Sequence, residues 1–127
     1  TIGDEPMQFY SKFPDAYVSV AEDRMIGIPS LLQAATDTDI IILDDAFQHR
    51  SVKPGLNILI MDVQRPFYKD FVLPYGRLRE NRTAYKRADV IVVSKCSSNF
   101  SQAQAQEVIA QIQPLEHQQV YFKPINP

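Results

Sequence analysis

Short apolar runs alternate along the chain with amphipathic stretches, and this alternation predicts the order of its strands and helices. Apolar runs rich in β-branched and aromatic residues predict strands at residues 16–20, 39–44, 56–62, 88–94 and 119–123. Apolar positions at helical spacing predict helices at residues 5–13, 26–35 and 101–113. Asp4 is a candidate N-cap for the first helix, with Pro6 in its first turn.

The predicted strands at residues 39–44, 56–62 and 88–94 are nearly continuous apolar runs, the pattern of parallel strands buried on both faces. Strands that alternate with helices favour an α/β fold with a mainly parallel sheet and flanking helices. Ligands of such sheets bind at the carboxyl ends of the strands. Residues 63–86 are long, aromatic and rich in Pro and Arg, which predicts a functional loop or a partly helical connection.

The composition is that of a soluble globular protein, with 45% hydrophobic and 22% charged residues. A net charge of −2 leaves no electrostatic footprint of a nucleic-acid-binding protein, so no nucleic-acid partner is expected. Cys96 is the only cysteine, which excludes an intrachain disulfide and makes the cytoplasm the default compartment. The apolar runs are too short to span a bilayer.

The ends of the chain indicate a piece of a longer protein. The first residue is Thr1 rather than Met, and a Pro-rich stretch at residues 122–127 follows directly on a predicted strand. A length of 127 residues suits one domain or part of one. We therefore expect residues 1–127 to form a single partial domain.

Candidate chemistry begins with Asp44 and Asp45, which follow the apolar run at residues 39–43. Carboxylates at the end of a rigid strand can hold Mg²⁺ on nucleotide phosphates, although acids in this position also cap the next turn. Gln48 and His49 follow directly and add an amide and an imidazole. Taken alone, His49 is typical of a hydrogen-bonded structural histidine.

Four segments in chain order resemble motifs of the tetraacyldisaccharide 4'-kinase family. They are Gly3-Asp-Glu-Pro6, Asp44-Asp-Ala-Phe-Gln-His49, Leu73-Pro-Tyr-Gly-Arg-Leu-Arg-Glu80 and Val93-Ser-Lys-Cys96. The resemblance runs from about Gly3 to Cys96, and the chain from Ser97 onward matches only in general character. Tyr75 departs from the family pattern, which has alanine in this turn, and the change bears on loop packing.

The resemblance implies a P-loop kinase that moves the γ-phosphoryl group of ATP, with Mg²⁺, to the 4'-hydroxyl of a tetraacyldisaccharide 1-phosphate. It implies work at the cytoplasmic face of an inner membrane, with peripheral membrane contact and a glycolipid substrate. The implied catalytic residues are Asp4, Glu5 and His49. The implied nucleotide and phosphate contacts are Arg24, Gln48, Arg77 and Arg79. The implied metal ligands are Asp44, Asp45 and Glu80.

Each implied role competes with a structural one. Asp4 and Glu5 suit a helix start, and Arg77 and Arg79 suit an exposed polar loop. An apolar cluster comes before the Pro-Tyr-Gly turn and fits core packing as well as an acyl-chain or membrane contact; its members are Phe67, Tyr68, Phe71, Val72 and Leu73. Further basic residues suggest a solvated face; they are Lys69, Lys86 and Arg87. Lys95 and Cys96, at a strand end, suit either a structural loop or a position near the nucleotide base.

The Gly-rich phosphate loop of the family precedes Asp4, and its second domain follows Pro127, so this central portion is expected to be inactive alone. Two other functions share the predicted fold. One is a switch-type P-loop ATPase or GTPase, which leaves the Phe-Gln-His and Leu-Arg-Glu segments unexplained. The other is an α/β module without catalysis, in which Asp44 and Asp45 are dispensable.

Overall fold

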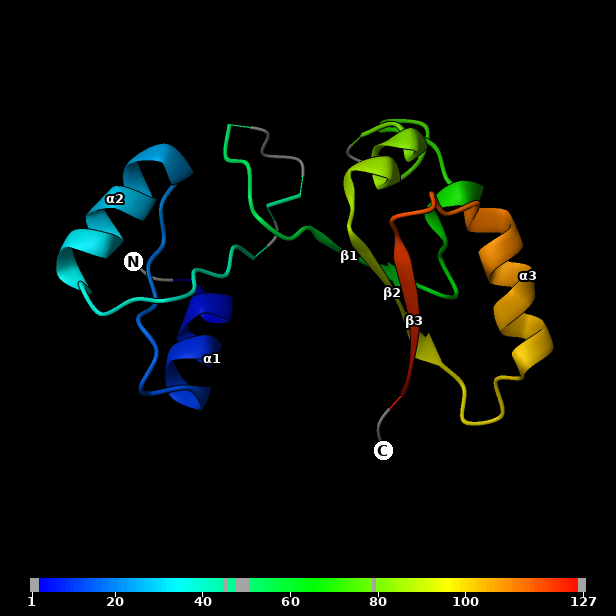
Figure 1. The fold of residues 1–127 in the computed structure, drawn as a ribbon, viewed down its shortest axis with the longest axis horizontal. Helices are drawn as coiled ribbons and strands as arrows, with labels where there is room; N and C mark the ends of the chain where they lie inside the picture. The colour runs from blue at the N-terminus through cyan, green and yellow to red at the C-terminus, as the bar shows by residue number, and fades with distance from the viewer. Residues whose placement is uncertain (1–2, 45, 48–50, 79, 126–127) are drawn as a thin grey trace. The chain divides into compact units, whose positions relative to one another are not determined.

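The computed structural model describes residues 3–44, 46–47, 51–78 and 80–125. It divides the chain into two compact units, Thr1–Lys53 and Pro54–Pro127. Figure 1 shows that the first unit is built around helices and that the second contains the sheet. The expectation of a single partial domain stays a prediction. In the part of the chain that is described, none of the helices has the length and apolar character of a membrane span.

The first unit contains α1 (Asp4–Lys12) and α2 (Arg24–Ala34), which confirm the two helices expected there. The N-cap of α1 is Gly3, whose backbone is extended and whose carbonyl accepts the Met7 N–H at 3.2 Å. The expectation that Asp4 caps this helix was therefore wrong by one residue, and Asp4 lies inside the first turn. The N-cap of α2 is Asp23, whose carboxylate accepts the Met25 N–H at 2.9 Å.

Two expected strands of the first unit do not form. Residues 16–20 are irregular, and so are the described residues 39–44. Ile40 and Ile42 are 79% and 88% exposed, while Ile41 and Leu43 are half-buried, so the run is not buried on both faces as expected. A strand is stabilised by the ladder it shares with a neighbour, and no described residue of this unit pairs with the run. Its composition alone does not supply that neighbour.

The second unit is a parallel three-stranded sheet in the order β1-β2-β3. Its strands are β1 (Ile58–Asp62), β2 (Val90–Cys96) and β3 (Gln119–Pro124), which confirms the last three predicted strands. Between β2 and β3 the chain forms α3 (Gln102–Ile112), again as predicted. Ser101 caps α3 in a reciprocal capping box with Gln104. The sheet and its helix establish the α/β class.

One face of the sheet carries the core. Ile91 and Val93 of β2 are fully buried, and Val108 and Ile112 of α3 are buried with them. The Phe100 and Phe122 rings, 5.6 Å apart, extend the same cluster. Because side chains alternate along a strand, the other face presents a second set of residues, which is largely exposed. Its most exposed members are Ile58, Ile60 and Tyr121.

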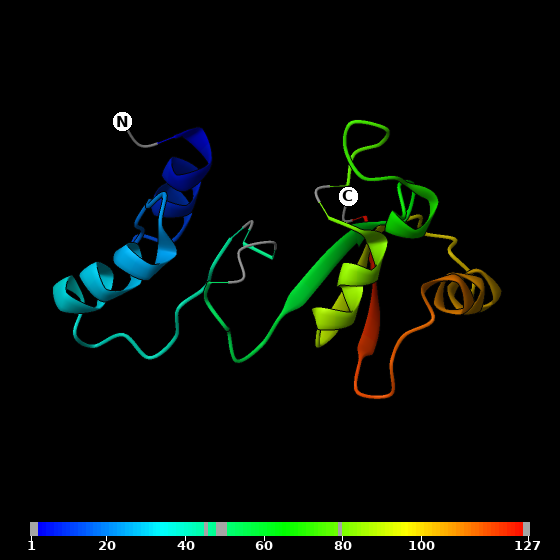
Figure 2. The ribbon, with the colours of Figure 1, turned by 90° about the horizontal axis from the view of Figure 1, so that it is seen from above.

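The connection from β1 to β2 is partly helical, as expected for its length. It contains η1 (Phe67–Lys69) and η2 (Arg82–Arg87), both 3₁₀ helices. Figure 2 shows the loop that follows η1 standing clear of the strands and of α3. Gln118 ties η2 to the rest of the unit, since its amide donates to the carbonyls of Tyr85 and Ala88, both at 2.8 Å. This connection holds several predicted site residues.

Candidate functional site

Asp4 and Glu5 open α1 with exposed carboxylates. Neither makes a side-chain cap bond in the described structure, and both lie where the positive end of the helix dipole favours a negative charge. Asp4 lines an open hollow formed along one side of α1 by Met7, Gln8, Ser11 and Lys12. A carboxylate in this position is accessible to a substrate hydroxyl, and it equally suits a helix start.

Arg24 is the first residue of α2, and its side chain is partly buried. Its Nη1 donates to the carbonyl of Ala21 at 2.5 Å, which anchors the guanidinium to the backbone before the helix. A guanidinium has five N–H donors, so one backbone bond leaves the geometry of a phosphate contact available. The predicted phosphate role of Arg24 stays a prediction.

The acidic segment is only partly described. Asp44 is exposed at the end of the apolar run, and Ala46 and Phe47 are half-buried. Asp45, Gln48 and His49 lie outside the described residues. The roles expected for these four polar residues therefore stay predictions.

Arg77 lies on a loop that Asp70 organises. The Asp70 Oδ1 accepts the backbone N–H groups of Phe71 and Arg77, at 2.7 Å and 3.1 Å. These two bonds lower the pKa of Asp70, the Phe71 N–H having the larger effect. The Arg77 residue itself is exposed, and Arg79 lies outside the described residues. The structure thus fixes the backbone of Arg77 and leaves its guanidinium at the surface.

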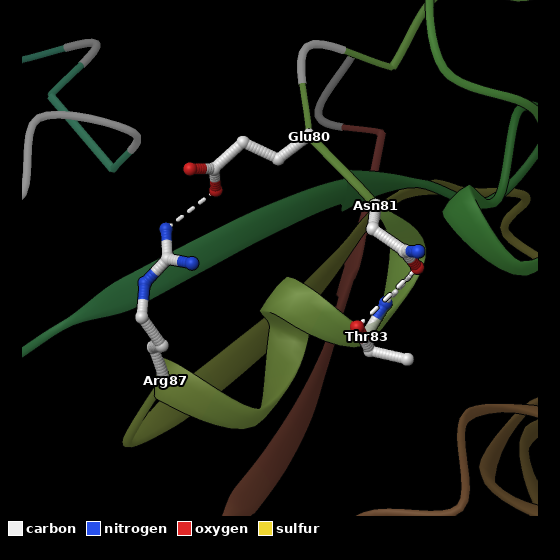
Figure 3. A network of polar contacts seen from close by, with 4 residues as sticks. All are labelled: Glu80, Asn81, Thr83 and Arg87. Carbon is white, nitrogen blue, oxygen red and sulfur yellow. Dashed lines mark hydrogen bonds and ion pairs between the residues drawn. The ribbon is translucent and has the colours of Figure 1, made fainter.

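Glu80 is held by an ion pair that the sequence does not reveal. Its Oε2 lies 2.6 Å from Nη2 of Arg87, at the far end of η2, and both side chains are partly buried. Figure 3 shows the two side chains reaching toward each other beside η2. At the start of this helix, Asn81 accepts the Thr83 N–H at 3.1 Å. Of the basic residues expected on a solvated face, Lys69 and Lys86 are exposed, whereas Arg87 is half-buried and paired. Arg87 ends the short helix that follows Glu80, and this helix brings the two residues, seven apart, onto one side.

A second ion pair joins the carboxyl ends of β1 and β2. The Lys95 Nζ lies 3.0 Å from Asp62 Oδ2, and the other carboxylate oxygen accepts the Gln64 N–H at 2.9 Å. The Gln64 bond and then the Lys95 ammonium lower the pKa of Asp62. Lys95 has a left-handed backbone, with φ of 60°. Asp62 ends the apolar run at residues 56–62 as Asp44 ends its own run, but the sequence alone assigns it no role.

Cys96, beside this pair, is a structural residue. Its side chain is buried, its Sγ lies 3.5 Å from the Val93 carbonyl, and burial raises the pKa of the thiol. A raised pKa keeps a thiol protonated and poorly nucleophilic. Of the predicted strand-end pair, only Lys95 presents a charged group to solvent.

A hollow of about 260 Å³ lies between the chain after β1 and the helix α3. Its lining includes Gln64, Tyr68, Lys69, Gln104 and Glu107. Burial, followed by the charge of Glu107, raises the pKa of Tyr68. None of the predicted site residues lines this hollow, so it is separate from the chemistry expected from the sequence.

The described structure brings together only neighbouring members of the predicted site. Asp4 and Glu5 share a helical turn, and Glu80 gains Arg87. Within residues 3–44, 46–47, 51–78 and 80–125, no three His, Cys, Asp or Glu side chains gather as metal ligands. The expected metal set includes Asp45, which those ranges omit, so the set stays a prediction.

A parallel sheet with a helix in its crossover connection and an ion pair at the carboxyl ends of two strands is an α/β architecture of the kind that binds ligands at that edge. A family model described as tetraacyldisaccharide-1-P 4'-kinase matches residues 1–125. The chain therefore belongs to the tetraacyldisaccharide-1-P 4'-kinase family.

Individual relatives agree with the family assignment. The chain is 42% identical over 125 residues to tetraacyldisaccharide 4'-kinase of Flavobacterium johnsoniae, which covers 98% of the chain and 37% of that protein. It is 46% identical over 126 residues to the enzyme of the same name from Parabacteroides distasonis, covering 98% of the chain and 34% of that protein. The chain thus spans about a third of the length of these relatives. No solved structure matches it.

Proposed function

We propose that this chain forms part of a kinase that transfers the γ-phosphoryl group of ATP to the 4'-hydroxyl of a tetraacyldisaccharide 1-phosphate in lipid A biosynthesis. The family match over residues 1–125 carries the proposal, since it spans all four motifs named above. The intact enzyme would work at the cytoplasmic face of the inner membrane, where its glycolipid acceptor lies.

Phosphoryl transfer asks a protein mainly for positioning and for stabilisation of the charge on the phosphoryl oxygens. In this proposal Asp4 accepts the proton of the attacking hydroxyl, assisted by Glu5 and His49. Arg24, Arg77, Arg79 and Gln48 contact the nucleotide and its phosphates. The open position of Asp4 on α1 supports its part, because a base must be accessible to the acceptor.

The donor chemistry of the proposed metal set fits Mg²⁺. Asp44, Asp45 and Glu80 are carboxylates, the hard oxygen ligands that this ion takes together with substrate phosphates. When bound, the ion would neutralise charge on the phosphate oxygens. The ion pair with Arg87 holds one carboxylate oxygen of Glu80. This fixed orientation suits a metal ligand.

The test is a chimera in which residues 1–125 replace the matched segment of the Flavobacterium johnsoniae kinase. The parent chimera is expected to phosphorylate tetraacyldisaccharide 1-phosphate with Mg-ATP. Asp4→Asn should lower kcat by about 10²-fold or more, the usual worth of a general base, with little change in KM for ATP.

Asp15→Asn is the matched control, because Asp15 is also an exposed acid of the first unit and lies in none of the family motifs. It should leave kcat within about twofold of the parent, the range expected of an exposed acid without a catalytic part. An Asp4→Asn chimera that turns over like the control would remove Asp4 as the base. A folded parent chimera without kinase activity would contradict the proposed function itself.

A further inference from the structure

A loop of the second unit exposes large apolar side chains. We call residues 70–78 the exposed loop. Phe71, Leu73 and Tyr75 are 62%, 58% and 90% exposed. Phe67 and Tyr68, which belong to the same apolar stretch of sequence, pack instead: the Phe67 ring lies 5.2 Å from that of Tyr85 and 5.7 Å from that of Tyr68. The apolar cluster at residues 67–73 therefore divides: Phe67 and Tyr68 pack together, whereas Phe71 and Leu73 face solvent.

The exposed loop is held by its own backbone. The Leu78 N–H donates to the Phe71 carbonyl at 3.0 Å, and the Leu73 N–H donates to the Leu78 carbonyl at 2.9 Å. Asp70 accepts two further N–H groups, as described above. A Cβ on Gly76 would collide with the Asp70 carboxylate and the Phe71 backbone, so the turn closes only with glycine. The apolar side chains are thus presented on an ordered frame.

Positive charge surrounds this loop. Residues 63–87 hold seven of the 13 Lys and Arg residues of the chain but only two of its 15 acids, a net charge of +5 in a chain of −2. Both acids are engaged: Asp70 is bonded to the loop backbone and lies within electrostatic reach of Arg77, and Glu80 pairs with Arg87. The side chains of Lys69, Arg77, Arg82 and Lys86 belong to exposed residues.

We propose that the exposed loop docks on the surface of an anionic lipid bilayer. Phe71, Leu73 and Tyr75 enter the headgroup and upper acyl region, where apolar area leaves water and the Tyr75 hydroxyl stays hydrated. Lys69, an exposed cation next to the loop, contacts the anionic headgroups. The proposal deepens the proposed function, because a kinase with a lipid acceptor needs a surface that meets the membrane.

Co-sedimentation of the 127-residue chain with lipid vesicles tests this, without nucleotide or acceptor. The chain should bind vesicles of phosphatidylcholine with phosphatidylglycerol and bind pure phosphatidylcholine much less. The triple variant Phe71→Ser, Leu73→Ser, Tyr75→Ser should bind at least about tenfold more weakly, because it loses the inserted apolar area. Lys69→Gln should lower binding about fivefold at low salt, the usual worth of one cation at an anionic membrane surface.

The matched control is Tyr10→Ser, Phe13→Ser, Tyr17→Ser, which removes three aromatic side chains of the first unit that are 59%, 52% and 59% exposed. It should bind vesicles like the parent. Circular dichroism spectra and melting curves that match the parent show that each variant is folded.

Three outcomes would overturn the proposal: a parent chain that ignores anionic vesicles, loop variants that bind like the parent, or a control that loses as much binding. If the loop binds a protein but the parent chain does not bind anionic vesicles, the proposal is also wrong. Because the assay contains no kinase reaction, its failure and that of the proposed function are separate results.

Discussion

Gln118 offers the sharpest test of how the second unit holds its connection in place. This side chain is only 8% exposed, the one polar residue among the buried set described. Its amide nitrogen donates to the carbonyls of Tyr85 and Ala88 at 2.8 Å, and its amide oxygen accepts the Leu115 N–H at 2.9 Å. One residue before β3 thus fixes the end of η2 and the start of β2.

The cost of losing these bonds follows from their number and burial. A net hydrogen bond contributes about 1 kcal/mol, and a buried carbonyl left without a donor costs about 1–3 kcal/mol. Gln118→Leu removes all three bonds and leaves the Ala88 carbonyl buried, while it adds some apolar contact. We expect it to lower the free energy of unfolding by about 2–4 kcal/mol, a large share of a typical domain's stability.

Urea denaturation of the 127-residue chain, followed by far-UV circular dichroism, measures this change. Gln106→Leu is the control, because Gln106 is exposed on α3; it should shift stability by less than about 0.5 kcal/mol. If Gln118→Leu falls within the same range as its control, the inferred role of the three bonds is refuted.

Gln118→Glu adds a pH test of the same geometry. Its carboxylate would face two carbonyl oxygens, so its folded-state pKa is raised above the usual value of about 4.3. The protonated acid can still donate to one carbonyl. The stability it contributes is therefore present below about pH 4.3 and is lost as the pH rises through the folded pKa. If the difference in unfolding free energy between Gln118→Glu and the parent is the same at acid and neutral pH, the two carbonyl oxygens do not face this side chain.

Two further predictions concern the core and the exposed loop. Ile91 is fully buried, so Ile91→Ala should lower the free energy of unfolding by about 2–5 kcal/mol and Ile91→Val by about 0.5–1.5 kcal/mol. Ile42→Ala, at an exposed position, should have little effect in the same urea assay. Asp70 has a lowered pKa, so its contribution to loop order should be complete above its unfolded value of 3.8 and disappear as the pH falls through the folded pKa. NMR titration of the Phe71 and Arg77 amides would follow this, and Asp70→Asn should abolish the acid transition; an unchanged transition would assign it to another group.

The sequence by itself determined the elements whose stabilising partners lie in the same unit of the chain. The apolar runs of β1, β2 and β3 and the capped, amphipathic α3 were predicted within about two residues, because each pattern matches the environment that the fold provides. The motifs also determined the family, which the comparison over residues 1–125 confirms.

Only the tertiary structure decided which apolar residues are buried and which charged residues are paired. The run at residues 39–44 reads as a buried strand but remains irregular, since strand pairing depends on a neighbour and not on composition. Phe67 packs while Phe71, close by in sequence, is exposed, because the turn organised by Asp70 and Gly76 directs the chain away from the core. Arg87 reads as a surface cation, yet the fold of η2 places it 2.6 Å from Glu80. Whether an apolar run finds a strand partner, and which of two neighbouring aromatic side chains packs, depends on three-dimensional proximity, and the linear pattern does not contain it.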